Sequence, residues 1–184
     1  MDVARAALDG GVQAVQVREK DLAGRELYTL AAQLRKLTEN YSARLFINDR
    51  IDVALAVEAD GVQLGQRSFS VATARSLLGP DKLIGVSAHN PAEIAAAAGA
   101  DFIVFGPVYF TPSKAAYGEP QGISRLRQAV KQSPMPVLAI GGINLERVPE
   151  VLATGAHGIA MISALSTAPN PDQVARELLA LLLE

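Results

Sequence analysis

The sequence has no cysteine, which excludes disulfide bridges, thiolate catalysis and zinc–sulfur sites and is typical of a reducing cytoplasm. It has no large excess of either charge, since the formal net charge is −2, so nothing indicates a nucleic-acid partner. No apolar run is long enough to cross a bilayer, and the N-terminal residues carry no signal-peptide core. We therefore expect a cytoplasmic protein with no membrane and no nucleic-acid partner.

Aromatic residues are also scarce, at 5% of the chain, whereas hydrophobic residues of all kinds reach 49%. A composition so rich in Ala, Val, Leu and Ile suits β-strands that are buried on both faces. The length of 184 residues is typical of one domain with a full hydrophobic core. We therefore expect a single domain that spans residues 1–184.

Seven short apolar runs recur along the chain, and a helix-like stretch follows each of them. They lie at 12–17, 44–47, 61–65, 83–87, 102–106, 136–142 and 158–163. This alternation predicts a parallel (βα) barrel, in which the chemistry gathers at the C-terminal ends of the strands. A closed barrel of this class has eight strands, so we expect a first strand upstream of Met1 that this chain lacks. The alternative is a short natural variant whose gap is filled by a partner or left open.

Several of these runs are preceded by a glycine and small residues, often with an aspartate directly before the strand. Asp60 and Asp101 are two such aspartates, and His157 precedes the last run. Residues at the N-terminal ends of barrel strands serve stability rather than chemistry. We therefore expect a structural role for these three residues.

Polar residues follow the first two apolar runs. Arg18 and Lys20 come after the run at 12–17, where two cations at alternate positions of an extended chain point the same way and could clamp an anion. The alternative is a solvated cluster of loop charges. Asn48 and Asp49 follow the next run, and a carboxylate beside an amide suits Mg²⁺, which prefers oxygen ligands. The alternative there is an Asn-Asp helix cap.

Two further runs end in hydroxyl-bearing residues. Ser87 could donate to a phosphate oxygen, and His89 is the candidate for proton transfer, although this segment also reads as a cap at the start of a helix. Thr111, Ser113 and Lys114 lie in the longest irregular stretch, after the run at 102–106. A lysine on such a loop could close over a diphosphate and neutralise the leaving charge.

The last two runs end in the pairs Gly141-Gly142 and Ile162-Ser163. Barrels commonly bind phosphate at this position through backbone N–H groups of glycine-rich turns and a helix N-terminus. The alternative is that these glycines only form turns. With the cations and the carboxylate described above, the mouth would hold two phosphorylated small molecules, one of them bound as a Mg²⁺-diphosphate.

A family resemblance is carried by QVREKD at 16–21, INDRIDVALAVEADGVQLGQ at 47–66, GVSAHNPAE at 85–93, GADFIVFGPVYFTPSK at 99–114, AIGGIN at 139–144 and GIAMISAL at 158–165. These segments resemble the thiamine phosphate synthase family, together with its close relative, the thiazole tautomerase. The resemblance implies a (βα)8 TIM barrel that begins with a strand of the type YLITDR, which has no counterpart here. It also implies that several copies assemble into a homo-oligomer, although no segment marks the interface.

The resemblance implies a transferase that joins hydroxymethylpyrimidine diphosphate to thiazole phosphate and releases pyrophosphate. The mechanism it implies is dissociative, with a pyrimidine methylene cation that the thiazole nitrogen captures. The implied residues are Arg18, Lys20, Asn48, Ser87 and Lys114 for the diphosphate, Asp49 for Mg²⁺, Thr111, Ser113, Gly142 and Ser163 for the thiazole phosphate, and Gln16 for the pyrimidine.

The sequence departs from the synthase pattern after the run at 61–65. The family has a second Mg²⁺-binding aspartate where this chain has Ser68, and Arg67 adds a cation. A hydroxyl is a weaker Mg²⁺ ligand than a carboxylate, so Ser68 is a weakened candidate ligand. This substitution resembles the tautomerase branch, whereas Pro107 stands in place of the histidine that marks that branch. We favour the synthase; the alternatives are a thiazole tautomerase and a barrel that binds thiazole phosphate or thiamine phosphate without turnover.

Overall fold

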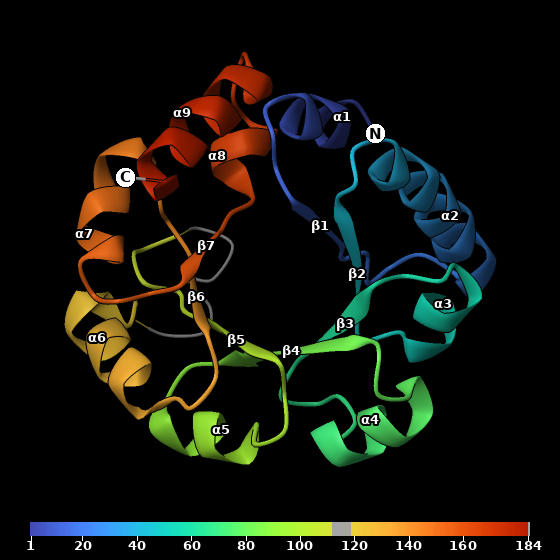
Figure 1. Cartoon of the computed structure of the whole chain (residues 1–184), viewed down its shortest axis with the longest axis horizontal. Helices are drawn as coiled ribbons and strands as arrows, with labels where there is room; N and C mark the ends of the chain where they lie inside the picture. Colours follow the sequence, from blue (N-terminus) through green and yellow to red (C-terminus); the bar gives the residue numbers. More distant parts are fainter. Residues whose placement is uncertain (112–118, 184) are drawn as a thin grey trace.

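The computed structural model describes residues 1–111 and 119–183, and in them seven parallel strands form one sheet in sequence order (Figure 1). The strands are β1 (Ala14–Val17), β2 (Arg44–Asn48), β3 (Gly61–Leu64), β4 (Leu83–Ala88), β5 (Phe102–Phe105), β6 (Val137–Ile140) and β7 (Gly158–Ala160). Each strand coincides with one of the seven predicted apolar runs, although β2 and β4 each extend one residue beyond theirs, so the predicted parallel strands and the fold class are confirmed.

Helices surround the sheet and pack against its outer face (Figure 1). They are α1 (Asp2–Asp9), α2 (Gly24–Asn40), α3 (Ile51–Ala56), α4 (Val71–Leu78), α5 (Pro91–Ala96), α6 (Gly122–Gln132), α7 (Val148–Leu152), α8 (Ser163–Ser166) and α9 (Pro171–Leu183), with a short 3₁₀ turn η2 (Leu145–Arg147) before α7. Within the described ranges, none of these helices combines the length and apolarity needed to span a membrane.

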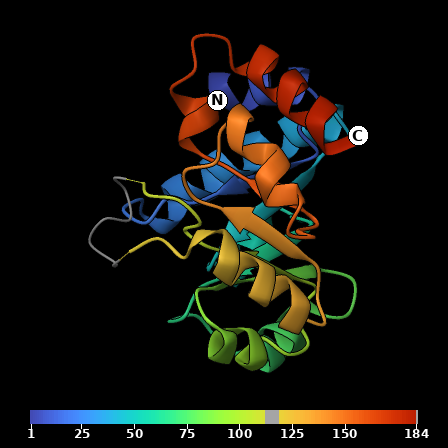
Figure 2. The same cartoon turned by 90° about the vertical axis from the view of Figure 1, so that its left-hand side faces the viewer.

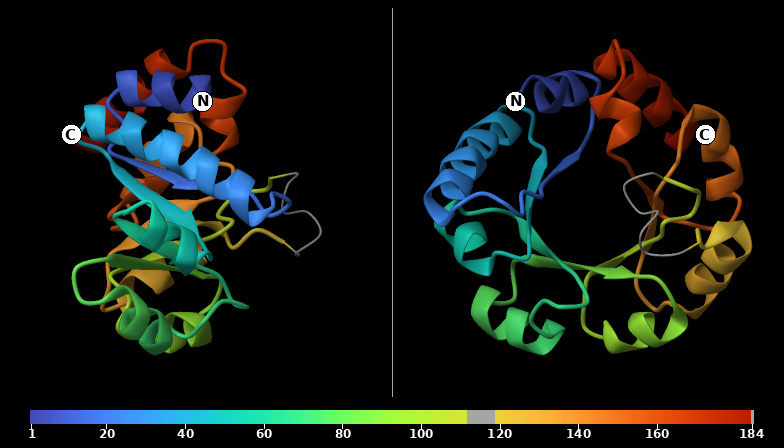
Figure 3. Two further views of the ribbon diagram at one scale, coloured as in Figure 1. Left: turned by 90° about the vertical axis from the view of Figure 1, so that its right-hand side faces the viewer. Right: turned by 180° about the vertical axis from the view of Figure 1, so that it is seen from behind.

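The sheet curls into a barrel whose strand layer is open between β1 and β7, which are its two edge strands. The outer layer continues across this opening, because α1 packs against α8 and α9 (Figures 2 and 3). Seven strands in the described residues agree with the sequence analysis. An eighth strand upstream remains a prediction.

Aromatic rings fill the inside of the barrel over glycines. The rings of Phe46 and Phe102 meet edge to face, with their centroids 5.4 Å apart. A Cβ atom on Gly61 would lie 2.8 Å from the Phe46 ring, and one on Gly85 would lie 2.4 Å from the Phe102 ring. Because real Cβ atoms do not approach so closely, glycine at these two strand positions makes room for the two rings.

An aspartate before β3 ties two strands and a helix together at the N-terminal end of the sheet. One Asp60 oxygen, Oδ2, accepts from the backbone N–H of Leu45 at 2.7 Å and from the Arg35 guanidinium at 2.6 Å. Asp101 repeats this arrangement with Arg75 and the backbone at the start of β4. Both aspartates therefore lie at the N-terminal face of the barrel, opposite the C-terminal ends of the strands, as the sequence predicted. Both hold the sheet together.

Candidate active site

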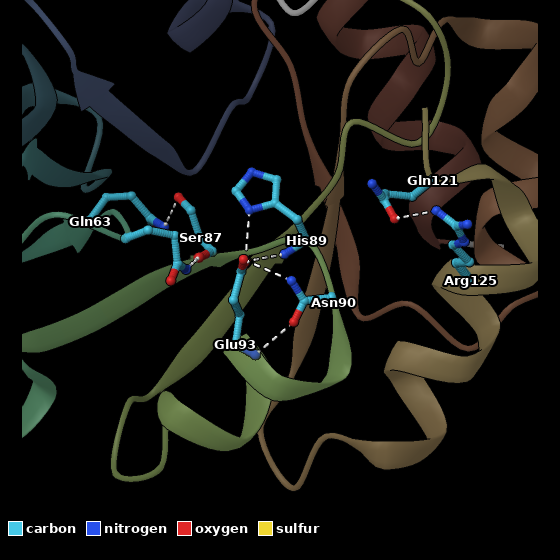
Figure 4. Close-up of polar contacts among 8 residues, drawn as sticks. Gln63, Ser87, His89, Asn90, Glu93, Gln121 and Arg125 are labelled. Atoms are coloured by element: carbon cyan, nitrogen blue, oxygen red, sulfur yellow. Dashed lines mark hydrogen bonds and ion pairs between the residues drawn. The ribbon is translucent and has the colours of Figure 1, made fainter. Parts of the chain in front are cut away.

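Four polar side chains lie on the first four strands, on the inner face near the C-terminal ends. They are Gln16 on β1, Asn48 on β2, Gln63 on β3 and Ser87 on β4. Asn48 pairs in register with Gln63, and the amide of Gln16 donates to Asn48 Oδ1 at 3.4 Å. Gln63 Nε2 donates to Ser87 Oγ at 3.1 Å (Figure 4). Three of these residues were candidates from the sequence, and the structure brings them into one row.

Gln63 is the member of this row that the sequence analysis missed. Its side chain is buried, with only 4% of its surface exposed. The signal in the sequence is a single polar residue at an inward-facing position of the apolar run at 61–65. Such a residue reads as part of a strand until its neighbours in space are known.

Arg18 and Lys20 lie directly after β1, at the end of the barrel where the row of four lies. Both side chains are exposed, and within residues 1–111 and 119–183 neither takes part in an ion pair. Because all seven strands are parallel, their C-terminal ends share one rim with these two cations. They are therefore placed to bind an anion at the mouth.

Asp49 follows β2 in the left-handed backbone region, with φ at 67°, and its N–H donates to the Gln63 carbonyl at 2.9 Å. The N-cap residue of α3 is Arg50, and no side-chain hydrogen bond caps that helix. Arg50 instead binds both carboxylate oxygens of Asp52, at 2.8 and 2.6 Å. The helix-cap reading of Asn48 and Asp49 is therefore wrong, and the exposed Asp49 carboxylate is left at the rim.

The residues predicted for Mg²⁺ line one hollow of about 620 Å³, in which Asp49 lies with Arg67 and Ser68. Ser68 Oγ accepts from the backbone N–H of Gly65 at 2.7 Å, so the hydroxyl closes the turn after β3 and keeps one lone pair. Among the described residues, no group of three or more His, Cys, Asp or Glu side chains could hold a metal by itself. Asp49 and Ser68 therefore fit Mg²⁺ only where one carboxylate binds the ion and waters and substrate phosphate oxygens complete its coordination.

His89 follows β4 and is bound to the next helix. Its Nδ1 lies 2.8 Å from Glu93 Oε2, and its backbone N–H donates to the same oxygen at 2.7 Å (Figure 4). Asn90 caps α5 by accepting from the Glu93 N–H. The helix-cap reading therefore holds for this segment. The His89 ring and Arg125 line a hollow of about 340 Å³ between α5 and α6. The role of His89 in proton transfer stays a prediction.

The glycine pair after β6 adopts positive φ values, 101° at Gly141 and 65° at Gly142. A Cβ on Gly142 would lie 2.7 Å from the Phe110 carbonyl oxygen, so the turn packs closely against the chain that leaves β5. Only glycine combines this backbone conformation with this close approach. The backbone of the turn is thereby held at the rim, where the sequence placed a phosphate site.

β7 ends at Ala160, earlier than the apolar run at 158–163 suggested. Ile162 is the N-cap residue of α8, and Ser163 begins that helix. The strand ends where its partner β6 ends, since Ala160 is in register with Ile140. Ile162 and Ser163 therefore lie in a strand-to-helix turn beside the glycine pair rather than on the strand itself.

The segment after β5 is bound to β6 before it leaves the described region. The N–H of Val108 donates to the Ile140 carbonyl at 2.8 Å, and that of Tyr109 donates to Gly141 at 3.0 Å. Thr111 is the last described residue before the gap. Ser113 and Lys114 lie outside the described residues.

Tyr109 anchors this segment to α7. Its hydroxyl donates to Glu150 Oε2 at 2.9 Å, and the Arg147 guanidinium lies over its ring. Burial, followed by the hydrogen bond to Glu150, raises the pKa of Tyr109 to about 12. The phenol is therefore neutral at physiological pH.

The sequence matches the family model of thiamine monophosphate synthase over residues 1–165. A protein of Geobacter sulfurreducens is 56% identical over 182 residues, which cover 98% of this chain and 85% of that protein. The thiamine-phosphate synthase of Archaeoglobus fulgidus is 46% identical over 98% of this chain and 85% of its own length.

Solved structures agree with the sequence comparisons. The thiamine phosphate pyrophosphorylase of Pyrococcus furiosus has a TM-score of 0.90 at 40% identity, and the match covers 99% of this chain and 88% of that one. The 3-hexulose-6-phosphate synthase of Salmonella typhimurium has a TM-score of 0.76 at 19% identity, covering 100% of this chain and 92% of that one, which shows a shared fold alone. From its sequence and its structure, the chain belongs to the thiamine monophosphate synthase family.

Proposed function

We propose that this chain is a transferase that joins hydroxymethylpyrimidine diphosphate to thiazole phosphate, giving thiamine phosphate and pyrophosphate. The observation that supports the proposal is the rim of the barrel, where cationic and polar side chains lie on one side and a glycine-rich turn lies on the other. Arg18 follows β1, Asn48 ends β2 and Ser87 is the penultimate residue of β4. Gly141 and Gly142 follow β6. The names of the relatives at 41–56% identity support the same reaction.

The diphosphate would bind on the side of β1 to β4. Arg18 and Lys20 supply positive charge, and the Ser87 hydroxyl and Asn48 amide supply neutral donors. Lys114 is predicted to add a second cation from the loop after β5. These groups lower the free energy of the departing pyrophosphate by charge stabilisation.

Mg²⁺ would be held by Asp49, with Ser68 as a weaker ligand and phosphate oxygens of the substrate completing the set. When bound, this ion supplies charge neutralisation of the diphosphate. The amide of Gln16, which bonds to Asn48, would face the pyrimidine ring and fix its orientation.

The thiazole phosphate would bind on the opposite side of the mouth. Backbone N–H groups of the Gly141-Gly142 turn and of the turn through Ile162 and Ser163 are the donors there. Thr111 and Ser113 are predicted to add hydroxyl donors from the loop after β5. The thiazole nitrogen would then face the pyrimidine methylene group.

In the reaction, the bond between the methylene carbon and the diphosphate oxygen breaks, and the electron pair leaves with pyrophosphate. The thiazole nitrogen then gives its lone pair to the methylene cation, and the new C–N bond forms. No proton moves in this sequence, so no general base is needed. The protein acts by placing the two substrates and by stabilising the leaving group.

The test is a side-by-side assay of product formation with and without Mg²⁺. We expect thiamine phosphate and pyrophosphate in equal amounts, and loss of both when a chelator removes the metal. Turnover unchanged by the chelator would contradict the Mg²⁺ assignment. Tight binding of thiazole phosphate with no product would contradict the transferase and favour a barrel that binds without turnover.

A thiazole tautomerase is the second candidate, and Ser68 in place of a carboxylate is the observation that favours it. The same assay run with thiazole carboxylate phosphate separates the two, since only the tautomerase converts that compound alone. We also propose that the protein acts in the cytoplasm and as a homo-oligomer. Fractionation and light scattering would test these two points.

A further inference from the structure

We propose that Gln63 is a positioning residue for the Ser87 hydroxyl, which it orients so that its proton points to the substrate diphosphate. The inference deepens the proposed function and rests on it. Gln63 is buried on β3, and its Nε2 donates to Ser87 Oγ at 3.1 Å (Figure 4).

The direction of this hydrogen bond decides what Ser87 offers a ligand. A serine hydroxyl has one proton and two lone pairs, and a carboxamide nitrogen only donates. Because Gln63 Nε2 occupies one lone pair of Ser87 Oγ, the serine proton has to be given to another acceptor. A phosphate oxygen in the mouth is an acceptor, so the bond from Gln63 makes Ser87 a donor to an anion.

The packing around Gln63 keeps its amide in this orientation. A Cβ atom on Gly85 would lie 2.3 Å from Gln63 Oε1, so the amide oxygen rests against the glycine and the nitrogen is turned to Ser87. A second glutamine holds the serine main chain, since Gln66 Nε2 donates to the Ser87 carbonyl at 2.6 Å. Ser87 is therefore fixed at both its hydroxyl and its backbone by β3 and the turn that follows it.

A buried glutamine could also serve stability alone, and a double-mutant cycle separates the two roles. The measured quantity is the affinity for inorganic pyrophosphate in the presence of Mg²⁺, by titration calorimetry, for Gln63→Met, Ser87→Ala and the double variant. We expect each single variant to bind about tenfold more weakly, the order of one hydrogen bond to a charged group. We expect the double variant to bind as weakly as Ser87→Ala alone. An equal loss from Gln63→Met with and without Ser87 would overturn the inference.

A second substitution keeps the shape of the side chain. In Gln63→Glu the carboxylate accepts the Ser87 proton and adds negative charge near the anion, so we expect weaker pyrophosphate binding than in Gln63→Met. Wild-type affinity in Gln63→Glu would also overturn the inference. Thr154→Val is the matched control, because it removes two buried hydrogen bonds away from the rim. It should lower the unfolding temperature without changing pyrophosphate affinity.

The readout also distinguishes this inference from the proposed function. If the wild type binds pyrophosphate with the expected cycle but forms no thiamine phosphate, the transferase proposal fails and the role of Gln63 stands. If thiamine phosphate forms while the cycle is additive, the role of Gln63 fails alone. In the active enzyme, Gln63→Met should raise KM for the pyrimidine diphosphate and leave KM for the thiazole phosphate unchanged.

Discussion

The guanidinium of Arg147 lies over the ring of Tyr109, with its central carbon 4.4 Å from the ring centroid. The same guanidinium donates to the Gly142 carbonyl at 2.5 Å. One side chain therefore joins the segment after β5 to the glycine turn after β6. The two parts of the proposed thiazole phosphate site are held together as one unit.

Arg147→Ala should loosen this unit. We expect KM for the thiazole phosphate to rise about tenfold, because only part of the free energy of the lost cation–π contact and hydrogen bond is expressed as weaker binding. KM for the pyrimidine diphosphate should stay near its wild-type value, because the diphosphate binds on the other side of the mouth. Steady-state kinetics with each substrate varied in turn measures both. An equal rise in the two constants would contradict the assignment.

We expect the folded protein to lose stability at alkaline pH because of the raised pKa of Tyr109. Its pKa is raised to about 12 in the folded protein, so folding favours the neutral phenol. The stabilisation is complete below the unfolded pKa of about 10 and disappears as the pH rises toward the folded value. Denaturant unfolding from pH 8 to 11 should show a shallower decline for Tyr109→Phe than for the wild type. The exposed Tyr28→Phe is the control, and its curve should match the wild type.

We expect the folded protein to lose stability in acid because of the lowered pKa of Asp60. Burial by itself would raise the pKa of Asp60, but the hydrogen bond from Leu45 and the guanidinium of Arg35 outweigh burial and hold the pKa below its ordinary value. The stabilisation is present above the unfolded pKa, near 4, and disappears as the pH falls through the folded value.

Asp60→Asn should therefore cost about 1 to 3 kcal/mol at neutral pH, the range for hydrogen bonds to a charged group, and flatten the acid side of the profile. Urea unfolding between pH 3 and 7 measures both effects. The exposed Asp81→Asn, which has no hydrogen bond or ion pair in the described residues, serves as the control. Equal effects of the two substitutions would show that the bonds of Asp60 carry no stability.

Ser68→Asp should strengthen Mg²⁺ binding, because it adds a second carboxylate to the hollow that Asp49 lines. We expect the Mg²⁺ concentration for half-maximal activity to fall roughly tenfold. The aspartate can still accept from the Gly65 N–H, so the turn is preserved. Ser68→Ala is the matched control and should raise this concentration. An unchanged Mg²⁺ requirement in both variants would remove residue 68 from the metal site.

Proton transfer by His89 belongs to the tautomerase alternative. In the proposed transferase, His89→Ala should change the rate of thiamine phosphate formation by less than about threefold, because that reaction moves no proton. Nδ1 of His89 is bound to Glu93, which indicates a local structural role. A loss on the order of a hundredfold, the scale of general acid–base catalysis, would contradict this expectation. Glu93→Gln is the companion variant, since it keeps the side chain's shape and removes its charge.

The sequence by itself determined the fold and which polar residues follow its strands. Buried parallel strands leave apolar runs of a few residues, and the turns after them leave polar residues, so both can be counted along the chain. This is why seven strands, and the places of Asn48 and Ser87 near the C-terminal ends of theirs, could be predicted, whereas Gln16 was implied by the family resemblance. The interpretation of Asn48 and Asp49 as a helix cap could be rejected only from the structure, where Arg50 is the N-cap residue of α3.

Only the tertiary structure decided which side chains meet across the sheet. Gln63 and Ser87 lie 24 residues apart, and Tyr109 and Glu150 lie 41 apart. No local pattern marks such pairs, because the strand register and the direction of each side chain arise from packing the whole sheet at once. The chain's periodicity fixes which residues reach the rim, while packing fixes which of them bond to one another.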